Sequence, residues 1–302
     1  MSKDMSSLIE QAAHRMAQLR EAGVDLPETP LPARPERPAG PTHATVLPEP
    51  PAAVLSRRVE IDLEALASAG IVSPNAPRSQ IADQFRVIKR PLIANAQGKG
   101  AAVVAKGNLI VVTSSLPGEG KTFTAINLAM SIAMELDCTV MLVDADVGRP
   151  SVMRVLGLPA GPGLLDMVQD ESLSMSGLLL RTNIDKLTLL PSGTPHPRAT
   201  ELLASVAMTR LLDDMARRYP ERIIVFDSPP LLLATESQAL ASHMGQVVMV
   251  VQADKTPQAK VIQALSTIES CPVKLMLLNQ ARTAPTAGYG YGYGYSPEPQ
   301  LA

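Results

Sequence analysis

The 302-residue chain is short of aromatic residues and of cysteine, and each shortage argues against a class of protein. It has no tryptophan, three phenylalanines and five tyrosines. Its two cysteines, Cys138 and Cys271, are far apart, with neither a Cys-x-x-Cys spacing nor a histidine pair nearby. This pattern argues against a disulfide framework and against a zinc site, and predicts buried thiols in a reducing compartment.

The chain also lacks an excess of positive charge and any long apolar run. Lys and Arg number 27 and Asp and Glu 29, so no global positive field favours nucleic acid as a partner. The apolar runs at 109–112, 247–251 and 275–278 are far shorter than the roughly 20 residues of a membrane helix. The N-terminus has no signal-peptide pattern. We therefore expect a cytoplasmic protein, with any membrane association coming through a partner.

Most of the tyrosines lie in one short segment. Residues 288–295 read GYGYGYGY, which places Tyr289, Tyr291, Tyr293 and Tyr295 at every second position. A core does not use aromatic residues in this way. The segment is either a low-complexity tail of no specific role or a set of side chains presented to a partner or an enzyme.

The pattern divides the chain into five parts. A capping box at Ser7 and Glu10 predicts a short amphipathic helix. Prolines at about every third residue of 27–51 predict an extended linker, and residues 61–74 predict a small helix that stops near Gly70. The expected parts are an N-terminal helix (1–25), a Pro-rich linker (26–56), a connecting segment (57–79), a main domain (80–283) and a flexible tail (284–302).

The main domain alternates short apolar runs with amphipathic stretches, which is typical of a parallel sheet covered on both faces. A helix is expected from residue 81 to 93, interrupted by Pro91. Strands are expected at 109–114, 139–146, 186–193, 222–230, 246–254 and 273–279, and helices at 122–136, 201–218 and 257–270. Right-handed crossovers make this a doubly wound, mainly parallel α/β fold.

A phosphate-binding loop follows the first of these strands. Residues 114–122 read SSLPGEGKT, with Ser115 where the P-loop motif has glycine. Backbone N–H groups of such a loop surround phosphates, Lys121 reaches the β and γ oxygens, and Thr122 binds Mg²⁺. The expected nucleotide-binding residues of this loop are Pro117, Gly118, Glu119, Gly120, Lys121, Thr122 and Phe123.

Two further strands end in acids. Asp144 and Asp146 follow one strand, and Asp227 follows another. A single aspartate after a strand is more often a helix cap, but three phosphate-site elements after three strands are hard to explain as caps. Ligands of open α/β sheets bind at this carboxyl edge, where acids can hold a metal shell and orient an attacking group.

The P-loop, the hhhDxD run at 141–146 and the hhhDxxP run at 224–230 together resemble the bacterial tyrosine kinases, which share a class with the partitioning ATPases. The resemblance spans about residues 80–295. It implies ATP and Mg²⁺ as cofactors, with Lys121 on the phosphates. It also implies Thr122 and Asp227 at the metal, and Asp144 as the group that helps deprotonate tyrosine. Asp146 would support the metal shell or the acceptor.

The same resemblance suggests two other roles. Asn279 corresponds to an asparagine that reads adenine in related ATPases, although a polar residue that merely ends a strand is an equal alternative. Asp83, Arg86 and Lys89 resemble an ExxRxxK segment used in ring assembly, and their spacing places the three charges on adjoining helical turns. Without the family context, a solvated charged face is the better interpretation.

Several positions depart from the family pattern. Asp83 replaces the usual glutamate, Gly148 stands where an arginine is common, and residues 194–198 read TPHPR where an asparagine is common. Leu116 replaces the signature lysine of many partitioning ATPases, which argues against an ATP-sandwich dimer.

The predicted function is a MgATP-dependent tyrosine autokinase that modifies tail tyrosines in trans and regulates exopolysaccharide production. The N-terminal helix, the Pro linker, the His-Pro loop and the run FRVIKRPL resemble the exosortase-associated branch, which implies a separate inner-membrane chain-length regulator as activator and a cognate phosphatase. The alternatives are a switch ATPase of the partitioning type and a nucleotide-sensing subunit of a polysaccharide export complex.

Overall fold

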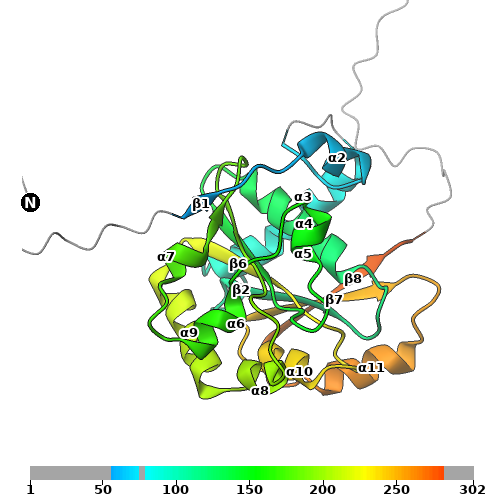
Figure 1. The fold of residues 1–302 in the computed structure, drawn as a ribbon. Helices are drawn as coiled ribbons and strands as arrows, with labels where there is room; N and C mark the ends of the chain where they lie inside the picture. The colour runs from blue at the N-terminus through cyan, green and yellow to red at the C-terminus, as the bar shows by residue number, and fades with distance from the viewer. Residues whose placement is uncertain (1–55, 75–78, 282–302) are drawn as a thin grey trace, which may run out of the picture. The chain divides into compact units, whose positions relative to one another are not determined.

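The computed structural model describes residues 56–74 and 79–281 (Figure 1). The predicted N-terminal helix, most of the Pro-rich linker and the tyrosine tail lie outside the described residues. The divisions at residues 25 and 283 also fall there, so these domain boundaries stay predictions.

A single eight-stranded sheet forms the centre of the described part, in the order β1-β4-β5-β3-β6-β2-β7-β8. Its pairs are parallel, apart from the antiparallel pair of β4 and β5. The strands are β1 (Arg57–Arg58), β2 (Leu109–Ser114), β3 (Thr139–Asp144), β4 (Leu180–Arg181), β5 (Leu187–Leu190), β6 (Arg222–Asp227), β7 (Gln246–Gln252) and β8 (Val273–Asn279). The predicted fold class and all six predicted strands are confirmed.

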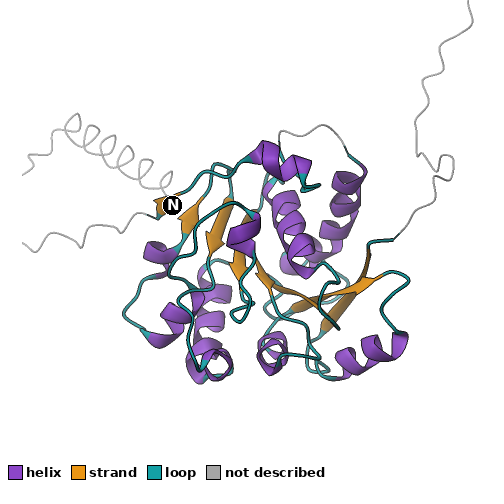
Figure 2. Cartoon of the chain, turned by 45° about the vertical axis from the view of Figure 1, so that its right-hand side comes forward, coloured by secondary structure: helices purple, strands orange, loops and turns teal. Residues whose placement is uncertain are grey.

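Helices cover both faces of this sheet (Figures 1 and 2). The helices are α2 (Leu63–Ser68), α3 (Gln80–Ala96), α4 (Lys121–Ala133), α5 (Val152–Val155), α6 (Leu164–Gln169), α7 (Met175–Leu178), α8 (Ala199–Leu203), α9 (Val206–Arg218), α10 (Thr235–Ser242) and α11 (Gln258–Ser266). In the described part of the chain, none of them combines the length and apolarity needed to cross a bilayer.

Each face of the sheet has its own hydrophobic core. Helices α2 to α5 pack over one face around residues such as Ile110 and Ile126. Helices α6 to α11 pack over the other around residues such as Phe226 and Leu212. The inner strand β2 is buried along its whole length, as its unbroken apolar run predicts. Cys138 and Cys271 are both buried and unpaired, as expected.

The prediction of one continuous helix over 201–218 is wrong. The segment forms two helices, α8 and α9, separated at Ser205. The Ser205 hydroxyl accepts a hydrogen bond from the Met208 N–H at 3.1 Å, which caps the second helix. A serine that can cap a new helix competes with continuation of the first, and the apolar period alone does not reveal this.

The predicted interruption at Pro91 is also wrong, because α3 runs through it from Gln80 to Ala96. Proline removes one helical hydrogen bond, which leaves the carbonyl of Val87 without its usual donor. Val87 is 70% exposed, so water can hydrate this carbonyl. Leu92, directly after the proline, is buried in the core and holds the second half of the helix in place.

Lys89 does not share the exposed face of Asp83 and Arg86. Asp83 and Arg86 pair with each other on the surface of α3. The Lys89 side chain instead turns inward, where Nζ lies 2.7 Å from Oε1 of Glu135 and donates to the Ser131 carbonyl at 2.5 Å. The expected row of three outward charges is therefore not present on this helix, and Lys89 joins α3 to α4.

We predict that Lys89→Ala lowers the free energy of unfolding by about 1 to 3 kcal/mol, because it removes a buried, charge-assisted contact between two helices. Arg90→Ala, one residue along on the exposed side, is the matched control and should change it by less than about 0.5 kcal/mol. Urea unfolding of both variants checks this. Equal effects of the two substitutions would contradict the structural role of Lys89.

Candidate active site

The loop between β2 and α4 has the backbone shape that phosphate binding requires. Gly118 and Gly120 adopt φ angles of 81° and 95°, a left-handed region that favours glycine. A side chain at Gly120 would also collide with the amide of Asn279, since an added Cβ would lie 2.1 Å from its Nδ2. Both glycines of the predicted motif are thus required by this conformation.

Helix α4 begins at Lys121 directly after this loop. Its N-cap, Gly120, has no side chain to satisfy the helix's first N–H groups, and the first turn contains no acidic residue. The positive end of the helix dipole is therefore left for an anion. Lys121 is itself 9% exposed, and its charge lowers the pKa of both Asp146 and Asp227.

Thr122 is held between the end of β6 and the residue before α5. Its hydroxyl donates to Oδ2 of Asp227 at 2.6 Å, and its Oγ1 lies 2.8 Å from the hydroxyl of Ser151. Asp227 ends β6, while Ser151 precedes α5. Ser151 was not expected at the site. Its only sequence signal is its place as a capping-type residue before a short helix.

Asp144 and Asp227 lie side by side at the carboxyl ends of two neighbouring strands. They are register partners in the pairing of β3 with β6, and both are fully buried. Oδ2 of Asp144 accepts hydrogen bonds from the backbone N–H groups of Ser151 at 3.0 Å and Val152 at 2.9 Å. The start of α5 therefore orients one oxygen of Asp144.

Burial raises the pKa of both carboxyl groups. The pKa of Asp227 rises to about 8, mainly through loss of water, although the Thr122 hydrogen bond acts in the opposite direction. The pKa of Asp144 rises to about 6, again mainly through burial, and its two backbone hydrogen bonds lower it. Nearby carboxylates raise both pKa values further, since Asp144 and Asp146 act on Asp227, and Asp146 acts on Asp144.

Asp146 occupies a more open position at the same edge. Its Oδ1 accepts from the Arg149 N–H at 3.2 Å. Partial burial raises the pKa of Asp146, nearby Lys121 lowers it, and Glu236 raises it. Glu236 lies in the first turn of α10, a helix that the sequence analysis did not expect.

The oxygen atoms at this edge fit a magnesium ion bound together with phosphates. Oδ1 of Asp144 and Oδ1 of Asp227 are buried and have no hydrogen-bond partner among the described residues. Within that part of the chain, no three His, Cys, Asp or Glu side chains form a metal cluster by themselves. Mg²⁺ bound with nucleotides takes only one or two carboxylates and completes its shell with phosphate and water, so this donor set is suitable.

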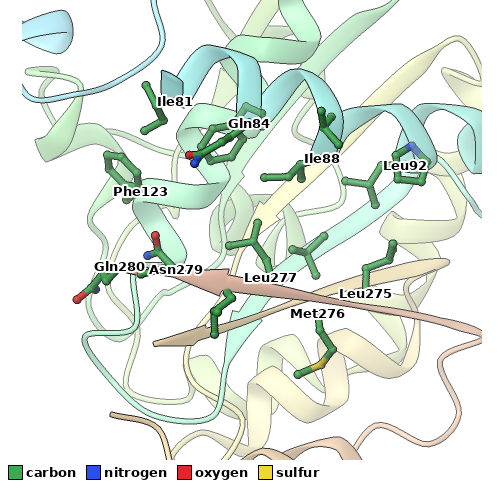
Figure 3. A pocket seen from close by; sticks show the side chains of 16 residues that line it. Ile81, Gln84, Ile88, Leu92, Phe123, Leu275, Met276, Leu277, Asn279 and Gln280 are labelled. Carbon is green, nitrogen blue, oxygen red and sulfur yellow. The ribbon is translucent and has the colours of Figure 1, made fainter. Parts of the chain in front are cut away.

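The end of β8 borders the other side of the P-loop. Asn279 Nδ2 donates to the Glu119 carbonyl at 2.9 Å, and Gln280 Nε2 donates to the Gly118 carbonyl at 3.0 Å. A groove of about 660 Å³ between α3 and β8 ends here, lined by Phe123 and by apolar residues of both elements (Figure 3). Gln280 was not expected at the site, and its sequence signal is only its place directly after a strand.

The structure thus brings together most of the predicted site. Lys121 and Thr122 lie beside the strand-end acids Asp144, Asp146 and Asp227, while Asn279 lies on the opposite side of the loop. Asp83 and Arg86 lie on the exposed surface of α3, and the four tail tyrosines are outside the described residues.

We predict that Asp227→Asn changes how stability depends on pH. A carboxyl group whose folded pKa is raised from 3.8 to about 8 stabilises the fold at low pH, and this contribution is lost as pH rises toward 8. In the metal-free wild type, stability therefore falls over this window, whereas the neutral variant lacks that loss. Between about pH 5 and pH 8, the free energy of unfolding of the variant should therefore rise by roughly 1 to 3 kcal/mol relative to that of the wild type. Urea unfolding at several pH values measures this. If the free energy of unfolding depended on pH in the same way in both proteins, the prediction would be contradicted.

Comparison with known proteins agrees with this geometry. A family model described as an AAA domain matches residues 107–279, more than half of the chain. The tyrosine-protein kinase YwqD of Bacillus subtilis (strain 168) is 30% identical over 206 residues, which cover 68% of this chain and 83% of that protein. The solved structure of the chimerical protein CapA2B2 is 26% identical, with a TM-score of 0.58, and the match covers 74% of this chain and 93% of that one.

A larger relative matches over part of its length only. The succinoglycan biosynthesis transport protein ExoP of Rhizobium meliloti (strain 1021) is 30% identical over 186 residues. The aligned region is 61% of this chain but 22% of ExoP, so the similarity concerns one part of that protein. With the P-loop, the two acidic strand ends and these relatives, the chain belongs to the family of bacterial tyrosine kinases.

Proposed function

We propose that this protein is a MgATP-dependent tyrosine autokinase that regulates exopolysaccharide production. The observation that carries the proposal is the cluster of Thr122, Asp227 and Asp144 at the carboxyl edge of the sheet, next to a P-loop with left-handed glycines. Two of its relatives are a tyrosine-protein kinase and a succinoglycan biosynthesis transport protein, which supports the reaction and the setting.

ATP is the nucleotide expected in this family, and the site has matching parts for it. The N-terminus of α4 and Lys121 would hold the phosphates. The base would lie toward Phe123 and Asn279, at the end of the groove that meets the P-loop (Figure 3). Apolar lining with few polar groups is what a heteroaromatic base requires.

Thr122, Asp227 and Asp146 would hold Mg²⁺ directly or through water. When bound, the ion neutralises charge that develops on the transferred phosphoryl group. The Thr122 hydroxyl donates its one proton to Asp227 and keeps its oxygen lone pairs for a cation, so this hydrogen bond and metal binding are compatible.

Asp144 would accept the proton of the attacking tyrosine hydroxyl. One of its oxygens is fixed by two backbone N–H groups, and the other is buried without a partner in the described part of the chain. Its pKa of about 6 leaves the carboxylate largely ionised at neutral pH while making it a better base than an ordinary aspartate. Asp146, the more open acid, would support the metal shell or the acceptor.

The acceptors would be Tyr289, Tyr291, Tyr293 and Tyr295, presented by a neighbouring copy of the chain. From Asn279 to Tyr289 is ten residues, a reach of up to about 33 Å when extended. Glycine spacers would allow several tyrosines to approach one site in turn. The reaction in trans rests on this reach and on the expected ring of copies.

A mixing experiment tests both the activity and its direction. One variant, Lys121→Met, keeps the tail but loses the phosphate ligand. The other replaces the four tail tyrosines by Phe and keeps the active site. With labelled MgATP we expect label on wild type and on neither variant alone, and transfer to the Lys121→Met chain when the two variants are mixed.

Tyr219→Phe is the matched control, since Tyr219 is the one tyrosine outside the tail, and its label should equal that of wild type. Label that appears on wild type but not in the mixture would contradict transfer in trans. Phosphate release without any labelled protein would favour the switch ATPase instead.

The proposed partners are other copies of the chain, an inner-membrane chain-length regulator that activates the kinase, and a phosphatase that reverses it. Asp83 and Arg86, paired and exposed on α3, would contribute to contacts between copies. Lys89 would act there only through the position of α3, because its ammonium group is used inside the chain.

We predict that phosphorylation dissociates the assembly. Each phosphotyrosine adds roughly −1.5 to −2 charges, so four bring about −6 to −8 to a subunit boundary. Sedimentation velocity should show smaller species after phosphorylation than before. The variant with four tail Phe residues, treated with the same MgATP, should keep its original size, and identical sedimentation of phosphorylated and unphosphorylated wild type would contradict the switch.

A further inference from the structure

Glu119 places a carboxylate inside the phosphate-binding loop. A negative charge there opposes an anionic ligand unless it is turned away and held by donors. The Glu119 side chain is turned inward, and the residue is 1% exposed. Contacts outside the P-loop motif must therefore hold the Glu119 carboxylate in this buried position.

Both carboxylate oxygens of Glu119 accept hydrogen bonds. Oε2 accepts from the Leu116 N–H at 2.6 Å, which closes the loop on itself. Oε1 accepts from the hydroxyl of Thr256, in the turn between β7 and α11. The side chain thus joins the first half of the P-loop to a turn that lies more than a hundred residues later in the sequence.

Further hydrogen bonds complete a closed circuit. Thr256 Oγ1 accepts from the Gln252 N–H at 3.2 Å, and Gln252 Nε2 donates to Gln280 Oε1 at 2.6 Å. Gln280 Nε2 then donates to the carbonyl of Gly118, the neighbour of Glu119. Because the Thr256 hydroxyl has one proton, which it gives to Glu119, the circuit depends on an acceptor at that position.

The two turns that carry this circuit have unusual backbone. Asp254 and Gln280 adopt φ angles of 59° and 57°, in a left-handed region that non-glycine residues seldom occupy. Such conformations persist only where surrounding contacts hold them, and they concentrate near functional sites. The hydrogen bonds of Thr256 and Gln280 are contacts of that kind.

We propose that Glu119 is a positioning residue: with Thr256, its carboxylate holds Gly118 to Gly120 in the conformation that binds nucleotide. This rests on the proposed function for the identity of the ligand. Glu119 acts through the loop backbone, and neither it nor Thr256 is assigned a role in phosphoryl transfer.

The decisive test is a pair of substitutions at Thr256, measured on the full chain. Thr256→Val keeps the shape of the side chain but removes its hydroxyl, whereas Thr256→Ser keeps the hydroxyl. Titration with a fluorescent ATP analogue should show affinity lowered about tenfold in Thr256→Val and close to wild type in Thr256→Ser. Hydrogen exchange of residues 114–122 should be faster in Thr256→Val only.

Substitutions at Glu119 test the same circuit from its other end. Glu119→Ala removes both acceptors and should lower affinity by roughly 10- to 100-fold. Glu119→Gln keeps one carbonyl oxygen and should lie between Ala and wild type. In labelled-ATP kinetics the losses should fall mainly on KM rather than on kcat.

The outcomes separate this proposal from the proposed function. Equal affinity and equal exchange in Thr256→Val and Thr256→Ser would overturn the role of Glu119 and Thr256. If even wild type fails to bind the ATP analogue, the proposed function fails. The hydrogen exchange of residues 114–122 alone then tests whether Glu119 and Thr256 hold the loop. Faster exchange in Thr256→Val would then still support this role, and unchanged exchange would refute it.

Discussion

Two carboxyl groups buried side by side, Asp144 and Asp227, set the constraint on which the rest of the site depends. Removing such groups from water is costly unless donors or cations compensate them. Thr122 supplies a donor to Asp227, and the backbone at the start of α5 supplies two to Asp144. One oxygen of each remains without a partner in the described part of the chain, and in the proposed reaction these oxygens would meet a cation and a proton.

Contacts on two sides hold the P-loop beside this pair. On the inner side, Thr122 links α4 to β6 and to the loop before α5. On the outer side, Asn279 and Gln280 reach its carbonyls from the end of β8, and Glu119 reaches Thr256. Backbone N–H groups can therefore stay directed at a ligand while the carbonyls and the one acidic side chain are occupied elsewhere. Such preorganisation lowers the cost of ordering a loop when a ligand binds.

Much of the fold and of the site was predictable, for identifiable reasons. A strand buried on both faces must be apolar throughout, so the six apolar runs revealed the strands of a parallel sheet. The acids and the Gly-Lys-Thr run come directly after such strands, and the carboxyl ends of parallel strands share one edge. Ser151, Glu236 and Gln280 were missed because each reaches the site from a turn or a short helix with no periodic pattern. Lys89 was assigned outward because spacing along a helix does not reveal that a long side chain can bend into the core beside Glu135.

By itself, the sequence determined the six main strands, the P-loop and its strand-end acids, because each depends on local pattern and on the general geometry of parallel sheets. Only the tertiary structure decided which residues distant in the sequence contact each other. It showed that α3 continues through Pro91, since Leu92 is anchored in the core, and that Lys89 is internal. It also showed that a P-loop glutamate meets a threonine in the turn between β7 and α11. These contacts join residues distant in sequence, and their partners are chosen by packing and by the need to satisfy buried polar groups, which no local pattern records.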